Sequence, residues 1–206
     1  LIERKLGVKV LVERPEEVVR LANLLKGEEV KRALKEVLEK FAVHKGVNGL
    51  EKAVRVYLAI KELLKRLRAT SITMDCFELL RKAKVTPCLS YSLLMGEGVV
   101  AGCELDLNST ATMLLLHRTL KKPVFMANIN RVNPGENTLT LSHCTAAYTL
   151  SMEKPELIPH FESGLPVSVR AYLRGERVTL AKLSLEELTL TVLTGEIERS
   201  GEVSRF

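Results

Sequence analysis

The change in hydrophobic periodicity near residue 150 most strongly constrains how this chain can fold. Up to Tyr148, short apolar runs alternate with segments of helical periodicity. Such alternation indicates an α/β layer with a largely parallel sheet. Beyond it, apolar and polar side chains alternate with a period of two in three segments, 167–173, 177–183 and 188–193. The turn signal at 174–176 predicts a hairpin, and therefore an antiparallel region that resembles part of a barrel or sandwich.

The two patterns predict an α/β domain over 1–152, incomplete at its N-terminus, and a β-rich, barrel-like, truncated region over 153–206. The clearest helix covers 50–67, where apolar residues recur every three or four positions. The other expected helices begin at Pro15 or cover 28–41, 89–95 and 108–120, the last capped by Asn108. The expected strands of the first domain cover 7–12, 71–76, 98–104, 123–128 and 137–144.

Composition and charge exclude several classes of function. The 206 residues include no apolar run near the roughly 20 that a membrane span requires, and no secretory leader. The net charge of +6 is spread over helix faces that also carry glutamates, and aromatic residues are only 4%, so we expect no nucleic-acid partner. We therefore expect a cytoplasmic protein. The absence of glutamine beside many Glu, Lys and Arg is typical of thermophile proteins.

The chain has four cysteines, at positions 76, 88, 103 and 144, and no two of them form a CxxC pair. Without a secretory context we expect them to be reduced and buried. A zinc site built from two of them and His143 is an alternative that the spacing does not support.

Polar residues follow three of the expected strands. Cys103, Glu104 and Asp106 follow one strand, Asn128 ends a second, and His143 and Cys144 follow a third. Ligands of open α/β sheets gather beyond the carboxyl ends of the strands, so these groups could converge on one metal ion or small polar ligand.

Simpler interpretations compete with a site. Glu104 could be an ordinary charge at a strand end, and His143 a hydrogen-bonded core histidine. We expect His44 and His160 to be solvated in loops and His117 to be structural. There is no GxGxxG, GxxxxGK[ST] or GxSxG motif.

Four short motifs in order resemble those of the L-fucose isomerase-like proteins, in particular an archaeal-type branch. The motifs are Val85-Thr-Pro-Cys-Leu89, Gly102-Cys-Glu-Leu-Asp106, Pro123-Val-Phe-Met-Ala-Asn128 and Leu141-Ser-His-Cys144. The resemblance covers roughly residues 48–205 and implies α/β domains followed by a β-barrel C-terminal domain. It also implies aldose–ketose isomerisation through an ene-diol, with a divalent metal, usually Mn²⁺, on the two sugar oxygens.

By this resemblance, Glu104 is the catalytic and metal-binding glutamate and His143 is a metal-binding or substrate-orienting histidine. Thr86, Cys103 and Asn128 are the implied sugar-binding residues. The family's second acidic ligand falls at Ala127 or Asn128, which are not acidic, so Asn128 or Asp106 would have to complete the metal site. A trimer or hexamer and a small sugar substrate are also implied.

The departures from the family pattern leave a second interpretation open. A further histidine that the isomerases use near their C-terminus has no counterpart here, and the chain begins at Leu1 rather than Met. We therefore expect a fragment of a longer protein. The alternative to an isomerase is a sugar-binding or regulatory relative of the same fold.

Overall fold

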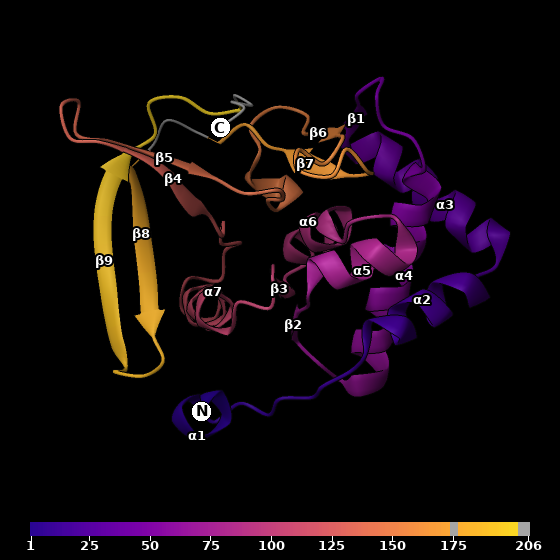
Figure 1. The fold of residues 1–206 in the computed structure, drawn as a ribbon, viewed down its shortest axis with the longest axis horizontal. Coiled ribbons are helices and arrows are strands. Elements are labelled where there is room, and N and C mark those ends of the chain that lie inside the picture. The colour runs from indigo at the N-terminus through magenta and orange to yellow at the C-terminus, as the bar shows by residue number, and fades with distance from the viewer. Residues whose placement is uncertain (174–176, 202–206) are drawn as a thin grey trace.

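Helices form most of one side of the molecule in the computed structural model, which describes residues 1–173 and 177–201 (Figure 1). The α-helices are α1 (Ile2–Leu6), α2 (Pro15–Leu24), α3 (Gly27–Lys40), α4 (Leu50–Leu67), α5 (Cys76–Ala83), α6 (Cys88–Gly96) and α7 (Leu107–Leu120), with a 3₁₀ helix η1 (Tyr148–Leu150). None of these described helices is both long and apolar enough to cross a membrane.

The strands form several small sheets rather than one large one. They are β1 (Ala42–Val43), β2 (Ser71–Thr73), β3 (Val100–Gly102), β4 (Asn128–Asn133), β5 (Thr138–Ser142), β6 (Glu156–Ile158), β7 (Ser168–Arg170), β8 (Arg177–Ser184) and β9 (Thr189–Glu196). The pairs β1–β6 and β2–β3 are parallel, whereas β4–β5, β6–β7 and β8–β9 are antiparallel. The mixed α/β class is therefore confirmed, while the expected large parallel sheet is not formed by the described residues.

Helix α4 is the centre of the helical side. Its apolar face, which includes Val54, Ile60 and Leu64, is buried, and α2, α3 and α6 pack around it. Hydrophobic burial of this face stabilises the helix far more than its intrinsic propensity does. The five helices expected from periodicity are confirmed within a few residues, but α1 and α5 were not predicted.

The parallel strands β2 and β3 lie between the helical core and the candidate site. Both strands are only three residues long, and β3 is completely buried between α6 and α7. At the end of β3, Gly102 lies so close to α7 that a Cβ atom there would be 1.9 Å from Oγ1 of Thr110. Only glycine permits this approach, which sets the position of Cys103 and Glu104.

Gly102→Ala is expected to lower the free energy of unfolding by about 1–3 kcal/mol, because Thr110 cannot easily move away. Its hydroxyl donates to the carbonyl of Asp106 at 2.6 Å. Urea unfolding measures the change, with Gly27→Ala as the control, since no atom lies within 4 Å of a Cβ at that position. Equal stability of the two variants would contradict the close-packing argument.

The C-terminal part is built of antiparallel strands, but the described residues close no barrel. Strand β7 pairs with β6, and β8 pairs with β9, so the predicted pairing of 167–173 with 177–183 is wrong. The turn expected at 174–176 lies outside the described residues. Strand β9 is exposed along its whole length and lies on the far side of β8 from the helices (Figure 1).

Two other expected strands differ. Residues 7–12 form no strand and pair with no described strand. Their apolar residues Val10, Leu11 and Val12 are exposed rather than buried. The strand expected over 123–128 begins only at Asn128 and runs on through Asn133. The boundary at residue 152 stays a prediction, although the pairing of β1 with β6 joins segments from both sides of it.

Candidate functional site

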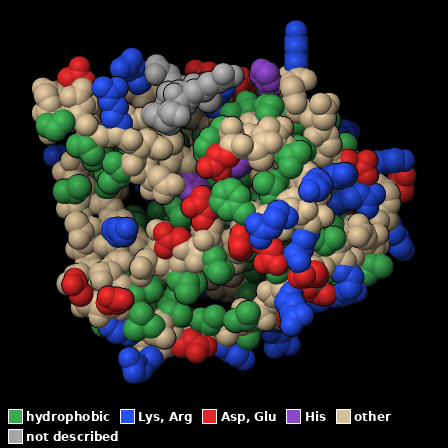
Figure 2. Space-filling model, viewed as in Figure 1, with side chains coloured by type: hydrophobic (Ala, Val, Ile, Leu, Met, Phe, Trp, Pro, Cys, Tyr) green, Lys and Arg blue, Asp and Glu red, His purple; other side chains and the backbone are tan. Residues whose placement is uncertain are grey.

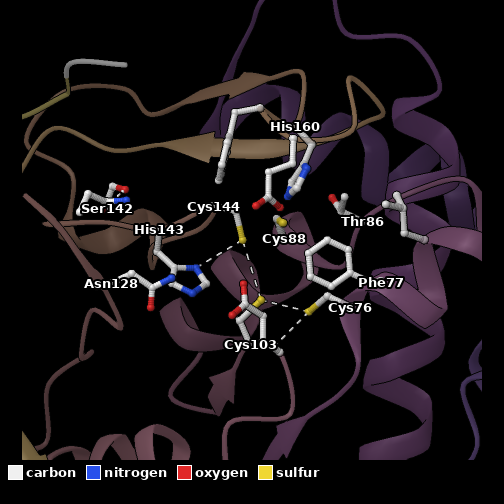
Figure 3. A pocket seen from close by; sticks show the side chains of 15 residues that line it. Cys76, Phe77, Thr86, Cys88, Cys103, Asn128, Ser142, His143, Cys144 and His160 are labelled. Atoms are coloured by element: carbon white, nitrogen blue, oxygen red, sulfur yellow. Dashed lines mark hydrogen bonds between the residues drawn. The ribbon is translucent and has the colours of Figure 1, made fainter. Parts of the chain in front are cut away.

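A pocket of about 120 Å³ opens beyond the carboxyl ends of β2 and β3. Cysteines follow both strands, because Cys76 begins α5 after β2, and Cys103 comes directly after β3. His143 and Cys144, which follow β5, line the same pocket. The first residue of α6, Cys88, and the loop after β6 complete the wall (Figure 3). The prediction that polar strand ends converge on one place therefore agrees with the placement of these groups.

All four cysteines are free, buried and gathered in this pocket. The sulfur atoms of Cys76 and Cys103 are 3.0 Å apart, and those of Cys103 and Cys144 are 3.8 Å apart. Figure 3 shows the sulfurs of these residues and of Cys88 facing one another between the surrounding elements. The expectation of reduced, buried cysteines agrees with this arrangement, but their gathering into one cluster was not predicted.

The thiols differ in their tendency to ionise. Hydrogen bonds from Cys144 and then Cys76 lower the pKa of Cys103. The hydrogen bond to Cys103 raises the pKa of Cys76 and also that of Cys144, and burial adds to both shifts. The hydrogen bond with Cys144 lowers the pKa of Cys88 despite its burial. Cys88 also begins α6, where the helix dipole favours a thiolate.

Two histidines enter the pocket, one of which was not expected there. His160 is only 6% exposed, so the prediction that it is solvated is wrong. Its loop folds back on itself, since the His160 amide donates to the Leu165 carbonyl and the Gly164 amide to the His160 carbonyl. In this loop conformation the ring of His160 points inward, with its ligand atom within 4.8 Å of the sulfur of Cys88.

His143 lies with Nδ1 3.3 Å from the sulfur of Cys144 (Figure 3). Its Nε2 atom is buried and has no hydrogen-bond partner. A buried polar atom without a partner costs free energy unless a ligand or water satisfies it. His143 is therefore placed to bind something that enters the pocket.

Glu104 supplies a carboxylate at the rim of the pocket. Both Glu104 and Leu105 have positive φ angles, of 58° and 56°, which are uncommon for residues other than glycine. Partial desolvation and the neighbouring Cys103 raise the pKa of Glu104, against an opposing effect of His143. A second carboxylate, that of Glu162, lines the pocket and was not predicted. On the face shown in Figure 2, histidine and acidic side chains gather near the centre.

The other expected site residues have different surroundings. Asn128 is exposed on the wall of the pocket. Thr86 is buried there, and its hydroxyl both donates to the Val167 carbonyl and accepts from the Val167 amide. That hydroxyl therefore joins the start of α6 to the segment that leads into β7.

Asp106 does not line the pocket; it is the N-cap of α7. Its Oδ1 accepts from the Ser109 amide at 2.8 Å and its Oδ2 accepts from the Ser109 hydroxyl at 2.6 Å. The cap was expected at Asn108, two residues later. Asp106, which was predicted as a metal ligand, therefore lies outside the pocket.

Asp106→Ala is expected to lower the free energy of unfolding by about 1 kcal/mol through loss of the cap. Asp106→Ser restores an oxygen that can accept from the same amide, so it is expected to recover most of that loss. Urea unfolding of the two variants measures the difference. A serine variant as unstable as the alanine variant would contradict the capping role.

The residues present do not fit Mn²⁺ well, because hard cations of this kind prefer oxygen ligands. Among the described residues, two groups of three side chains bring their ligand atoms within 4.8 Å of one another. They are Cys88, Cys144 and His160, and Cys103, His143 and Cys144. Neither group contains a carboxylate, so both are sets of thiol and imidazole donors, although Glu104 and Glu162 line the same pocket.

Comparison with known proteins finds that this chain is distantly similar to a sugar isomerase. No protein-family model matches the chain. The chain is 25% identical over 175 residues to sulfoquinovose isomerase of Alkalicoccus urumqiensis, an alignment that covers 82% of this chain. The chain spans only 39% of the length of that relative.

Proposed function

We propose that this chain carries the substrate pocket of a sugar isomerase that interconverts aldoses and ketoses. The observation that carries the proposal is the pocket beyond β2 and β3, which gathers the carboxylate of Glu104 and the buried, unpartnered Nε2 of His143. The distant similarity to sulfoquinovose isomerase supports the same class of reaction. The cytoplasmic location and the homo-oligomer stay predictions.

Glu104 is proposed as the base that moves the proton. It takes the proton from C2 of the open-chain aldose, and the electron pair of that bond forms the C1=C2 double bond of the ene-diol. The C1 oxygen takes up a proton, which His143 is placed to supply. The carboxylic acid of Glu104 then returns its proton to C1, while the hydroxyl at C2 gives its proton back to His143 and becomes the carbonyl, so no oxidant or reductant is needed.

The proposal is tested by ketose formation with the complete gene product. The panel contains L-fucose, D-arabinose, L-arabinose and sulfoquinovose, each with and without added Mn²⁺. Ketose formation on at least one sugar is expected. A folded protein that converts none of them would contradict the isomerase proposal, and turnover that requires Mn²⁺ would show that the carboxylates rearrange to accept it.

A second candidate is a sugar-binding relative without isomerase activity. It is favoured by the lack of an acid at Ala127 and Asn128, and by the absence of a carboxylate from both metal-ligand groups of the described residues. Titration calorimetry with the same sugars separates the two candidates. Binding without ketose formation would favour this candidate, whereas turnover would exclude it.

A further inference from the structure

Four elements that are distant in sequence bring their cysteines to one buried place. Cys76 and Cys88 begin α5 and α6, Cys103 follows β3, and Cys144 follows β5. All four are buried, with Cys88 only 1% exposed. A buried free cysteine is ordinarily an isolated small apolar residue. Here Cys103 contacts both Cys76 and Cys144, and Cys88 lies within 4.8 Å of Cys144 and His160, so the thiols and imidazoles form a set of metal-binding donors instead.

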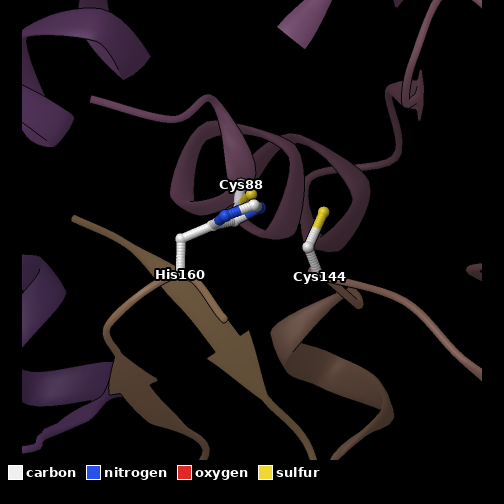
Figure 4. Close-up of side chains that lie close together, drawn as sticks. All are labelled: Cys88, Cys144 and His160. Carbon is white, nitrogen blue, oxygen red and sulfur yellow. The ribbon is translucent and has the colours of Figure 1, made fainter. Parts of the chain in front are cut away.

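One of the two sulfur separations, that of Cys103 and Cys144, suits two ligands of a single metal ion, whereas the 3.0 Å between Cys76 and Cys103 is too short. In a tetrahedral zinc site with Zn–S bonds of about 2.3 Å, two thiolates lie about 3.8 Å apart. The sulfur atoms of Cys103 and Cys144 are 3.8 Å apart. The ligand atoms of Cys88, Cys144 and His160 also lie within 4.8 Å of one another (Figure 4). An iron–sulfur cluster would hold its cysteines further apart, because irons and sulfides lie between them.

Neighbouring groups hold His160 in an orientation that suits a ligand. Its Nδ1 is 3.2 Å from the Ser163 hydroxyl, which also accepts from the Leu165 amide. With a proton assigned to Nδ1, the other ring nitrogen is left free on the side of Cys88. Metal-binding histidines ordinarily have such a partner on the second nitrogen, which fixes the ring.

The backbone of two of the cysteines is also fixed. The Thr145 hydroxyl donates to the Cys88 carbonyl at 2.7 Å. The Cys144 carbonyl accepts from the Val169 amide of β7 at 3.0 Å. These bonds fix the backbone at Cys88 and Cys144, so the positions of the two thiols are set by the fold.

We propose that Cys88, Cys144 and His160 bind one zinc-class cation at the floor of the pocket; Cys103, whose sulfur is 3.8 Å from that of Cys144, lies outside this group of three. Thiolate and imidazole donors favour Zn²⁺ over Mn²⁺. His143 belongs to the second group of potential ligands, with its Nδ1 3.3 Å from the sulfur of Cys144 and its Nε2 buried without a partner. Glu104 lines the same pocket, but binding of the ion does not depend on the isomerase proposal.

Cobalt binding tests the site directly. The complete gene product is reduced, stripped of metal and titrated with Co²⁺ without oxygen. The expected result is one equivalent of Co²⁺, a thiolate-to-cobalt charge-transfer band and the intense visible absorption of tetrahedral cobalt. Zn²⁺ should displace it at one equivalent, whereas a large excess of Mn²⁺ should not.

Variants identify the ligands. Cys144→Ser and His160→Asn are each expected to weaken Co²⁺ binding by at least about 100-fold, because loss of a direct ligand costs more than the roughly 10–100-fold typical of a group that only supports a ligand. The matched control is Cys76→Ser, which changes a buried thiol of the same cluster that is not a proposed ligand and should alter the affinity less than about threefold. Circular dichroism establishes that each variant is folded, and His160→Asn tests the site even where the cysteine variant does not fold.

Several results would overturn the proposal. One is reduced, folded protein with four reactive thiols and no charge-transfer band. A second is a stable disulfide among the four cysteines that reductant cannot open, and a third is iron with acid-labile sulfide. A loss in Cys76→Ser as large as in Cys144→Ser would also contradict the assignment. None of these results depends on turnover, so failure here and failure of the isomerase proposal are distinguishable.

Discussion

Glu104→Gln is expected to lower kcat for ketose formation by about 10²–10⁴-fold, the range for loss of a positioned general base. Glutamine keeps the size of the side chain and can still hydrogen-bond to a sugar, but it cannot accept the C2 proton. KM is therefore expected to change much less than kcat. Steady-state kinetics on the sugar that shows turnover measures both constants, and exchange of the C2 hydrogen with solvent deuterium reports the proton step itself.

The matched control for this prediction is Glu162→Gln. Glu162 lines the same pocket and is also exposed, so the substitution removes the same charge from the same place. We expect this variant to keep kcat within about tenfold, an electrostatic effect on a screened surface charge. If Glu162→Gln lowered kcat by the amount predicted for Glu104→Gln, and Glu104→Gln itself had little effect, the base would be Glu162.

The sequence predicted the main helices and the polar residues at the strand ends well. The apolar face of 50–67 became the buried face of α4, because a helix with such a face must cover it. Glu104 and His143 line one pocket because β3 and β5 end near one another. Segment 7–12 shows the limit of this reasoning, since an apolar run becomes a strand only where a partner strand is available.

The thiol cluster could not be read from the sequence, because it depends on tertiary contacts. The four cysteines are 12, 15 and 41 positions apart from one to the next along the chain, and no local motif joins them. His160 was placed in solvent because it stands between Pro159 and Phe161 in a loop. The bonds that fold this loop inward join its own backbone atoms, which leave no pattern in side-chain type.

Removal of a bound zinc-class ion is expected to lower the melting temperature by about 5–10 °C. An ion present at 100 times its Kd stabilises the folded state by about 2.7 kcal/mol if it does not bind the unfolded chain. For a chain of this length, each kcal/mol corresponds to about 2–4 °C. Calorimetry of the reduced protein with chelator, and again with Zn²⁺ restored, measures the shift.

The same shift separates a bound ion from a general effect of zinc on thiols. Cys144→Ser is expected to show almost no difference between the chelated and zinc-loaded protein, because it lacks a central ligand. Cys76→Ser is expected to keep the full shift, although it too loses a buried thiol. If instead all three proteins were stabilised equally, the ion would be bound elsewhere; if none were, the cluster would be a set of packed thiols. Only a zinc-dependent melting shift that is lost in Cys144→Ser and kept in Cys76→Ser would show that the ion stabilises the fold by binding at the floor of the pocket.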